Sequence, residues 1–317
     1  VQMEKPPSAI ADIFAKLKEQ GINCYYGKWL VDGSPKIILI DSSGLIGKKD
    51  EYKAMLYDRF EVDSLRANWE FEEPMLWSIA VGKFLAEFQR QSLDQKMVAH
   101  FHEWLAGIGL LWLQAEAARV ATVFTTHATI LGRSLAGKGR DLYAELETID
   151  PAREAYDCQI EAKHTVEKAC ALHADIFTTV SASTAIEAEK LLGRKPEVLV
   201  LNGLDSDFFP TMEDLAILHH NTRNKMREVF SYHFFPYPGQ FFDLEQSLAF
   251  FIVGRYEYKN KGLDIYLEAL AKLNEQMKKQ NHHKTVVAII WIPAGISRLR
   301  TELMESKNYY QHIRHYV

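Results

Sequence analysis

Cysteine is scarce and unpatterned in this sequence, with three residues (Cys24, Cys158 and Cys170) among 317. No CxxC pair occurs, so neither a disulfide framework nor a zinc ribbon is indicated. Such cysteine usage is typical of proteins from a reducing compartment, and we expect a cytoplasmic protein.

Long apolar runs are also missing. None approaches the roughly 18 residues of a membrane-spanning helix, and the longest candidate, residues 286–292, has the length of a buried strand. The first seven residues lack the basic-then-apolar pattern of a signal peptide. Position 1 is Val1 and not Met, which favours a true start further upstream. We therefore expect no membrane association.

An excess of positive charge is the third absence. Lys and Arg number 37 against 42 Asp and Glu, for a net charge of −5, which excludes a generic electrostatic nucleic-acid binder. The motifs GxGxxG and GxxxxGK[ST] are absent too, so neither a nicotinamide dehydrogenase nor a P-loop NTPase is supported. The apolar fraction of 47% is that of an ordinary globular protein, and the length favours two domains.

What the sequence does contain is a regular alternation of short apolar runs and longer helical patterns. We predict strands at 23–29, 36–41, 97–101, 121–126, 176–181, 197–201, 247–254 and 285–292. We predict helices at 9–19, 75–88, 105–117, 153–173, 184–192, 212–234, 262–279 and 297–317. Several strands are continuous Val, Ile and Phe runs, which favours strands covered on both faces. The alternation predicts an α/β fold of βαβ units with parallel sheets.

A domain boundary is expected near the middle of the chain. Residues 233–243 contain two Pro and a Gly and show no periodicity. We therefore expect a first Rossmann-like domain at 1–236, a linker at 237–243 and the beginning of a second Rossmann-like domain at 244–317.

Three strand ends of the first domain carry polar residues that are well placed to touch a ligand, because ligands of open α/β sheets bind at the carboxyl ends of strands. In the segment 98–109, His100, His102 and Glu103 mark the turn from strand to helix. A packed or capping histidine is an equal alternative for His102. The pattern His100-x-His102-Glu103 also allows a metal interpretation, since i and i+2 share a strand face; we disfavour it because the HExxH pattern is absent and the rest of the sequence offers no evident further ligand.

Two further strand ends follow in the first domain. His127 and Arg133 follow the strand of segment 123–133. The alternative is a loop with no binding role, in which the threonine hydroxyls only satisfy backbone groups. Asn202 follows the strand at 197–201 and signals a turn.

The second domain opens with a cationic loop. Arg255, Lys259 and Lys261 lie between the strand that ends near Gly254 and the next helix. Cations beside the N-terminus of a helix make a good site for a diphosphate. A solvated loop with incidental lysines is the alternative.

Together these segments resemble the glycogen synthases of the animal and fungal type. The matching strings are HFHEWLAGIGL, VFTTHATILGR, FTTVSASTAIEAEKLLGRKPEVLVLNGLD and FFIVGRYEYKNKGLDIYLEALAKLN, and the resemblance extends from about residue 5 to 295. It implies the GT-B architecture of two Rossmann-like domains. It also implies retaining, metal-independent transfer of glucose from a nucleotide sugar, usually UDP-glucose, to the 4-hydroxyl of a glycogen chain end, with the donor in the cleft between the domains and no cofactor.

The resemblance also implies roles for single residues. Arg255 and Lys261 match the cations that hold the donor diphosphate, and His102 matches the active-site histidine; these are the expected catalytic residues. The expected donor-binding residues are His127, Arg133, Asn202, Arg255 and Lys261. On the helix at 212–234, His219 and Arg223 match positions that contact an allosteric effector, glucose 6-phosphate, with Arg in place of Lys.

The chain also departs from the family. A Lys-Val-Gly-Gly loop, a later pair of glutamates and a C-terminal arginine helix are absent. We therefore expect a partial chain that needs the missing parts for activity. The alternatives are a non-catalytic binding or partner module of the same family and another GT-B glucosyltransferase. Expected partners are glycogen, UDP-glucose and a glycogenin-type primer protein; the family is homo-oligomeric, and the sequence leaves the donor nucleotide (UDP or ADP) and the oligomeric state open.

Overall fold

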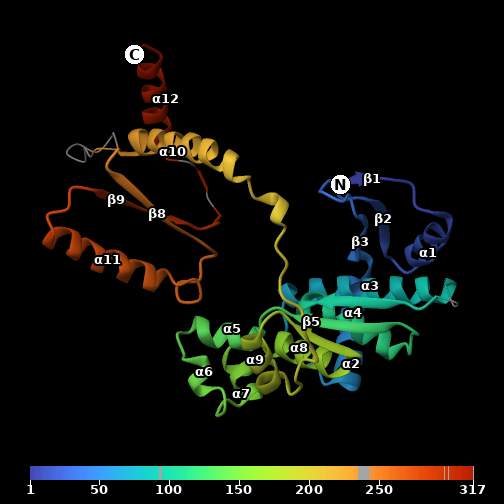
Figure 1. Ribbon diagram of the computed structural model, residues 1–317. Helices are drawn as coiled ribbons and strands as arrows, with labels where there is room; N and C mark the ends of the chain where they lie inside the picture. Colours follow the sequence, from blue (N-terminus) through green and yellow to red (C-terminus); the bar gives the residue numbers. More distant parts are fainter. Residues whose placement is uncertain (93–94, 235–242, 244, 296, 299, 317) are drawn as a thin grey trace. The chain divides into compact units, whose positions relative to one another are not determined.

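A computed structural model describes residues 1–317 except 93–94, 235–242, 244, 296, 299 and 317. The chain divides into two compact units, Val1–Asn202 and Gly203–Val317, which are described separately here (Figure 1). Each unit contains a parallel sheet with helical connections, so the predicted α/β class is confirmed.

The main sheet of the first unit has four parallel strands. They are β4 (Val98–His102), β5 (Ala121–Thr126), β6 (Ile176–Thr179) and β7 (Val198–Leu199), in that order. Phe124 and Phe177 lie side by side on β5 and β6 and are completely buried, as expected of covered strands. Because β4 extends to His102, this histidine is the last residue of the strand.

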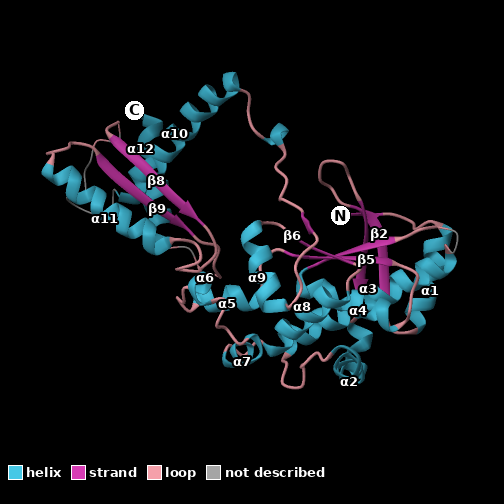
Figure 2. Ribbon diagram, turned by 60° about the horizontal axis from the view of Figure 1, so that its bottom comes forward, coloured by secondary structure: helices cyan, strands magenta, loops and turns pink. Residues whose placement is uncertain are grey.

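Helices connect and cover these strands. Three of them pack in succession, α3 (Trp69–Gln91) on α4 (Glu103–Ala115) and α4 on α8 (Glu161–His173), and both α4 and α8 contact β5 (Figure 2). The remaining helices of the unit are α1 (Ser8–Glu19), η1 (Ser43–Lys48), α2 (Lys49–Phe60), α5 (Ile130–Gly137), α6 (Leu142–Glu145), α7 (Pro151–Asp157) and α9 (Ala182–Leu192).

The first predicted strands correct the expectation of parallel pairing. β1 (Gln2–Met3), β2 (Asn23–Lys28) and β3 (Lys36–Asp41) form a separate antiparallel sheet, in which Asn23 pairs with Asp41 and Lys28 with Lys36. Only residues 29–35 connect β2 to β3, and a parallel crossover needs a dozen or more residues. The short connection therefore forces a hairpin.

Two helix predictions also change. The helix predicted at 153–173 is interrupted between α7 and α8, where Gln159 adopts a left-handed φ of 57° that ends the first helix. Helix α2 was not predicted, since its apolar residues follow no clear helical period, although Tyr52 and Leu56 are buried one turn apart.

The second unit contains one βαβ element. β8 (Ser247–Val253) and β9 (Thr285–Trp291) pair in parallel from Ser247 opposite Thr285, and α11 (Leu263–Lys279) connects them. The unit also contains η2 (Ser206–Phe208), α10 (Met212–Phe234) and α12 (Thr301–Tyr316).

The compact units divide earlier than the expected domain boundary. α10 packs on α12, and the Ser306 hydroxyl donates a 2.6 Å hydrogen bond to the Tyr232 carbonyl, so this helix clusters with the second unit. Most of the predicted linker, 237–243, lies outside the described residues. A functional boundary near residue 236 stays a prediction.

Candidate functional site

Three histidines gather at the carboxyl end of the main sheet of the first unit. The ring centroids of His100 and His102, two residues apart on β4, are separated by 4.1 Å. The His102 centroid lies 5.3 Å from that of His127, and a 3.0 Å hydrogen bond joins His102 Nδ1 to His127 Nε2. The structure thus brings together the predicted His102 and His127, at the sheet edge where ligands of α/β folds bind.

Two threonine hydroxyls form a chain of hydrogen bonds that ends at the ring of His100. His100 Nε2 lies 2.6 Å from Thr125 Oγ1, which lies 2.5 Å from Thr178 Oγ1 on the next strand. Both threonines are buried, so these hydrogen bonds fix the ring of His100 against the sheet.

The surroundings of His100 and His102 disfavour protonation of both rings. Partial burial lowers the pKa of His100 and of His102 below the ordinary value, although both rings keep solvent-exposed surface. Repulsion from His127, and for His102 also from His100, adds to this effect. The rings are therefore neutral near pH 7, where an imidazole can both donate and accept a hydrogen bond.

A buried carboxyl group anchors the loop that carries His127. Glu167 on α8 is fully buried; its Oε1 accepts a 2.5 Å hydrogen bond from the Thr126 hydroxyl and its Oε2 a 2.9 Å hydrogen bond from the Ile130 N–H. The sequence analysis missed Glu167. The sequence feature that could have identified it is its position on the apolar side of the helix: it lies beside Val166 and three positions before Cys170, and both of these are core residues.

Burial raises the pKa of Glu167 to about 8, and the nearby Glu103 adds to this rise, whereas the hydrogen bonds from Thr126 and Ile130 and the charge of Arg133 oppose it. Between pH 4.5 and 8 the folded protein therefore binds a proton that the unfolded chain has released, so this group reduces stability as pH rises.

We expect Glu167→Gln to remove that dependence, because an amide does not titrate. The free energy of unfolding of the variant minus that of the wild type should grow from pH 5 to pH 8 by on the order of a few kcal/mol. Chemical denaturation at several pH values measures it. His164, whose pKa burial lowers to about 4, acts in the opposite direction below pH 6.5, but it is common to both proteins and cancels. A constant difference would contradict the assignment.

The other predicted residues of the first unit are Arg133 and Asn202. Arg133 is exposed on α5, and its charge reaches Glu167. Asn202 is exposed beyond β7 at the last position of the unit. Their roles stay predictions.

In the second unit, the predicted cations gather where β8 ends and α11 begins. Arg255 is exposed, and its Nε lies 3.3 Å from Glu257 Oε1. Lys259 pairs with Asp264 at 3.1 Å, while the stem of Lys261 lies over Gly254. Gly262 caps α11 with a left-handed φ of 68° and no side-chain hydrogen bond. The loop thus presents positive side chains beside a helix N-terminus, an arrangement that suits an anion.

The expected effector residues share one helix face. His219 and Arg223 are exposed on α10 and lie four positions apart, which places them on neighbouring turns of the same side. Their role stays a prediction.

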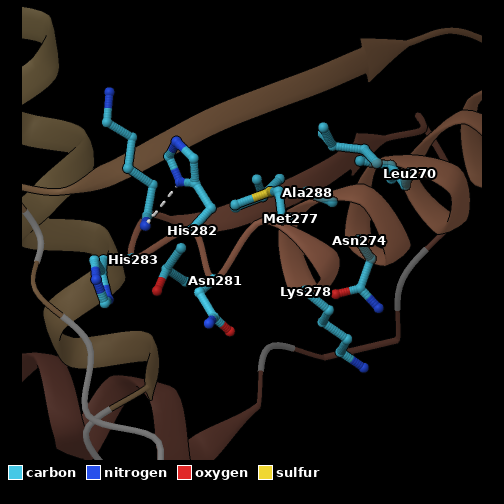
Figure 3. Close-up of a pocket in the computed structure, with 12 residues that line it drawn as sticks. Leu270, Asn274, Met277, Lys278, Asn281, His282, His283 and Ala288 are labelled. Carbon is cyan, nitrogen blue, oxygen red and sulfur yellow. Dashed lines mark hydrogen bonds between the residues drawn. The ribbon is translucent and has the colours of Figure 1, made fainter.

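A hollow of about 880 Å³ lies elsewhere in the second unit (Figure 3). It is lined by the end of α11, including Met277 and Lys278, by His282 and His283, and by the start of β9. None of the predicted site residues lines it. Because it adjoins the amino end of β9, whereas Arg255 follows the carboxyl end of β8, we do not assign the site to this hollow.

Within the described part of the chain, no group of three or more His, Cys, Asp or Glu side chains could hold a metal ion. Glu103 instead accepts a hydrogen bond from the His127 N–H. Nor does any described helix have the length and apolarity required to cross a membrane.

Comparison with known proteins extends over the whole chain. The family model described as glycogen synthase matches residues 1–317. Glycogen [starch] synthase isoform 2 of Saccharomyces cerevisiae is 39% identical and covers 96% of this chain, which spans 44% of that protein. The Neurospora crassa enzyme is 37% identical over 92% of this chain and 41% of its own length, and the Caenorhabditis elegans enzyme is 37% identical over 92% and 44%.

Among solved structures, the catalytic domain of starch synthase IV from Arabidopsis thaliana, bound to ADP and acarbose, aligns with a TM-score of 0.45 at 14% identity. This alignment covers 92% of this chain and 56% of that one. The chain spans less than half the length of the curated relatives named above. The match to the family model over all 317 residues shows that the chain belongs to the glycogen synthase family.

Proposed function

We propose that the protein to which these 317 residues belong transfers glucose from UDP-glucose to the 4-hydroxyl at a non-reducing end of glycogen, with retention, in a GT-B arrangement. The observation that supports it most is the family match over residues 1–317 together with relatives whose names are glycogen [starch] synthase. The histidine cluster and the cationic loop both lie at carboxyl ends of strands, as this proposal needs.

The chemistry of the leaving group explains the cationic loop. Breaking the bond from the anomeric carbon to the β-phosphate oxygen leaves an additional negative charge on the diphosphate. Arg255 and Lys261 would stabilise that charge as it develops, and fixed cations do so without reorganising solvent. Glu257, which pairs with Arg255 through a single 3.3 Å contact, would give way to the stronger phosphate ligand.

The neutral histidines suit the sugar end of the donor. An imidazole with a lowered pKa can accept a hydrogen bond from one glucose hydroxyl while its other nitrogen donates, and it adds no positive charge beside an electron-poor anomeric carbon. We assign this contact to His102, with His127, Arg133 and Asn202 as further donor-binding residues. His219 and Arg223 remain our candidates for the phosphate of glucose 6-phosphate.

The test is transfer of radiolabelled glucose from UDP-glucose to glycogen by the full-length protein. We expect turnover in the wild type and a loss of at least 100-fold in kcat for His102→Ala, on the scale of removing one preorganised contact to the transition state. His283→Ala, in the hollow of the second unit that none of the predicted site residues lines, is the matched control and should retain activity. Binding of glycogen without any transfer would favour the non-catalytic alternative.

A further inference from the structure

Glu103, a residue with no assigned role, connects the two loops of the histidine cluster. It follows His102 directly and begins α4, yet its Oε1 accepts a 3.0 Å hydrogen bond from the main-chain N–H of His127 on the neighbouring loop. The carboxylate thus reaches across from the end of β4 to the end of β5. Among the described residues, the His127 N–H has no backbone acceptor, and Glu103 is its hydrogen-bond partner.

The backbone of Glu103 is held in an unfavourable conformation. Its φ is 63°, in the left-handed region that residues other than Gly, Asn and Asp seldom adopt. Such a conformation persists only where surrounding interactions outweigh its cost. The hydrogen bond to the His127 N–H is an interaction of this kind, because it needs the side chain to leave its own helix and point to the next strand.

The His127 loop is anchored at its ends independently of Glu103. Glu167 holds Thr126 and Ile130, and the Thr129 side chain caps α5 by accepting from the Gly132 N–H. Glu167 and Thr129 therefore already stabilise the start of α5, and Glu103 is not needed for it. What remains for Glu103 is the middle of the loop, where it fixes the main chain of His127.

We propose that Glu103 is a positioning residue, which holds His127 so that its Nε2 stays 3.0 Å from His102 Nδ1 and thereby fixes the orientation of the His102 ring. The inference deepens the proposed function, on which it rests for its catalytic consequence but not for its geometry. Beside its partial burial, the groups that lower the pKa of His102 are His100 from its own strand and His127 from the adjoining turn.

Two substitutions separate the hydrogen bond from the charge. Glu103→Gly removes the side chain while favouring the left-handed backbone, so the fold should persist. Glu103→Gln also removes the charge but keeps an oxygen that can accept from the His127 N–H. In the 317-residue chain with histidines labelled at Cε1, NMR titration reports the pKa of His102; spectra of His102→Gln and His127→Gln give the assignments.

We expect the pKa of His102 in Glu103→Gly to rise only by the part that His127 contributes, because burial and His100 still lower it, and to keep its wild-type value in Glu103→Gln. Equal titration of His102 in both variants would overturn the proposal. In the full-length protein we expect Glu103→Gly to lower kcat about 10- to 100-fold with a smaller change in KM, and Glu103→Gln to restore most of it. An inactive wild type would refute the proposed function and leave the NMR result standing.

Discussion

Replacing Arg255 or Lys261 by alanine is expected to lower the kcat of the full-length protein by about 100- to 1,000-fold each, as for other groups that stabilise charge in a transition state. The reason is the diphosphate: its additional charge develops as the glycosidic bond breaks, and each cation is needed more at that moment than in the ground state. The measurement is initial-rate transfer from UDP-glucose to glycogen.

The surroundings of both cations make this a clean experiment. Arg255 and Lys261 are exposed, and their ion pair and packing contacts lie at the surface. Truncation leaves no buried cavity, so the free energy of unfolding should change by no more than about 0.5 kcal/mol. A loss of activity at unchanged stability therefore reports on chemistry.

The matched control is Lys272→Ala. Lys272 is an exposed cation of the same unit and pairs with Glu268, one turn away on α11, at 2.6 Å. It should retain full activity. Arg255→Lys should recover part of the lost rate, because it keeps the charge but not the planar fork of donors. Near-normal activity in both alanine variants would refute the diphosphate assignment.

The strands that the sequence predicted well are those marked by continuous apolar runs. The runs at 121–126 and 285–292 correspond to β5 and β9. The predicted helices between successive strands indicated that β5 pairs in parallel with β4 and β6, and β9 with β8. The prediction of parallel pairing was wrong for β2 and β3. The composition of a strand does not distinguish parallel from antiparallel pairing. The length of the connection, and not the strand composition, decides the direction.

Some residues of the candidate site could be predicted from the sequence and others could not. Strand ends locate His102, His127, Arg255 and Lys261, because polar residues that end or follow a parallel strand lie toward the carboxyl edge of the sheet. The partners of these residues could not be predicted. Glu167 and Glu103 act across 37 to 41 and 24 positions of sequence, and no local period encodes such contacts.

Close packing behind the cluster provides the second large effect. Gly109 on α4 has no side chain, and a Cβ there would lie 2.8 Å from Phe101 Cε1 and 2.8 Å from the Ser78 carbonyl oxygen of α3. The Ser78 hydroxyl accepts a 2.6 Å hydrogen bond from the Gly109 N–H and donates another to the Ala106 carbonyl. The glycine therefore lets α3, α4 and β4 approach one another closely.

We expect Gly109→Ala to reduce the free energy of unfolding of the 317-residue chain by about 1–3 kcal/mol, since overpacking outweighs the gain in helix propensity of up to about 1 kcal/mol. Urea denaturation followed by tryptophan fluorescence measures it. Gly47→Ala is the control, because no atom lies within 4 Å of a Cβ at that position, and its stability should change by no more than about 0.5 kcal/mol.

Gly109→Ala should also change the positions of the His100 and His102 rings. Phe101, which the new methyl group would displace, lies on β4 between His100 and His102, and the strand is too short to absorb a shift without moving both rings. We therefore expect the His102 titration of Gly109→Ala to change together with its stability. An altered stability with an unchanged titration would show that β4 and its histidines are held by the sheet alone, independently of the packing of α4.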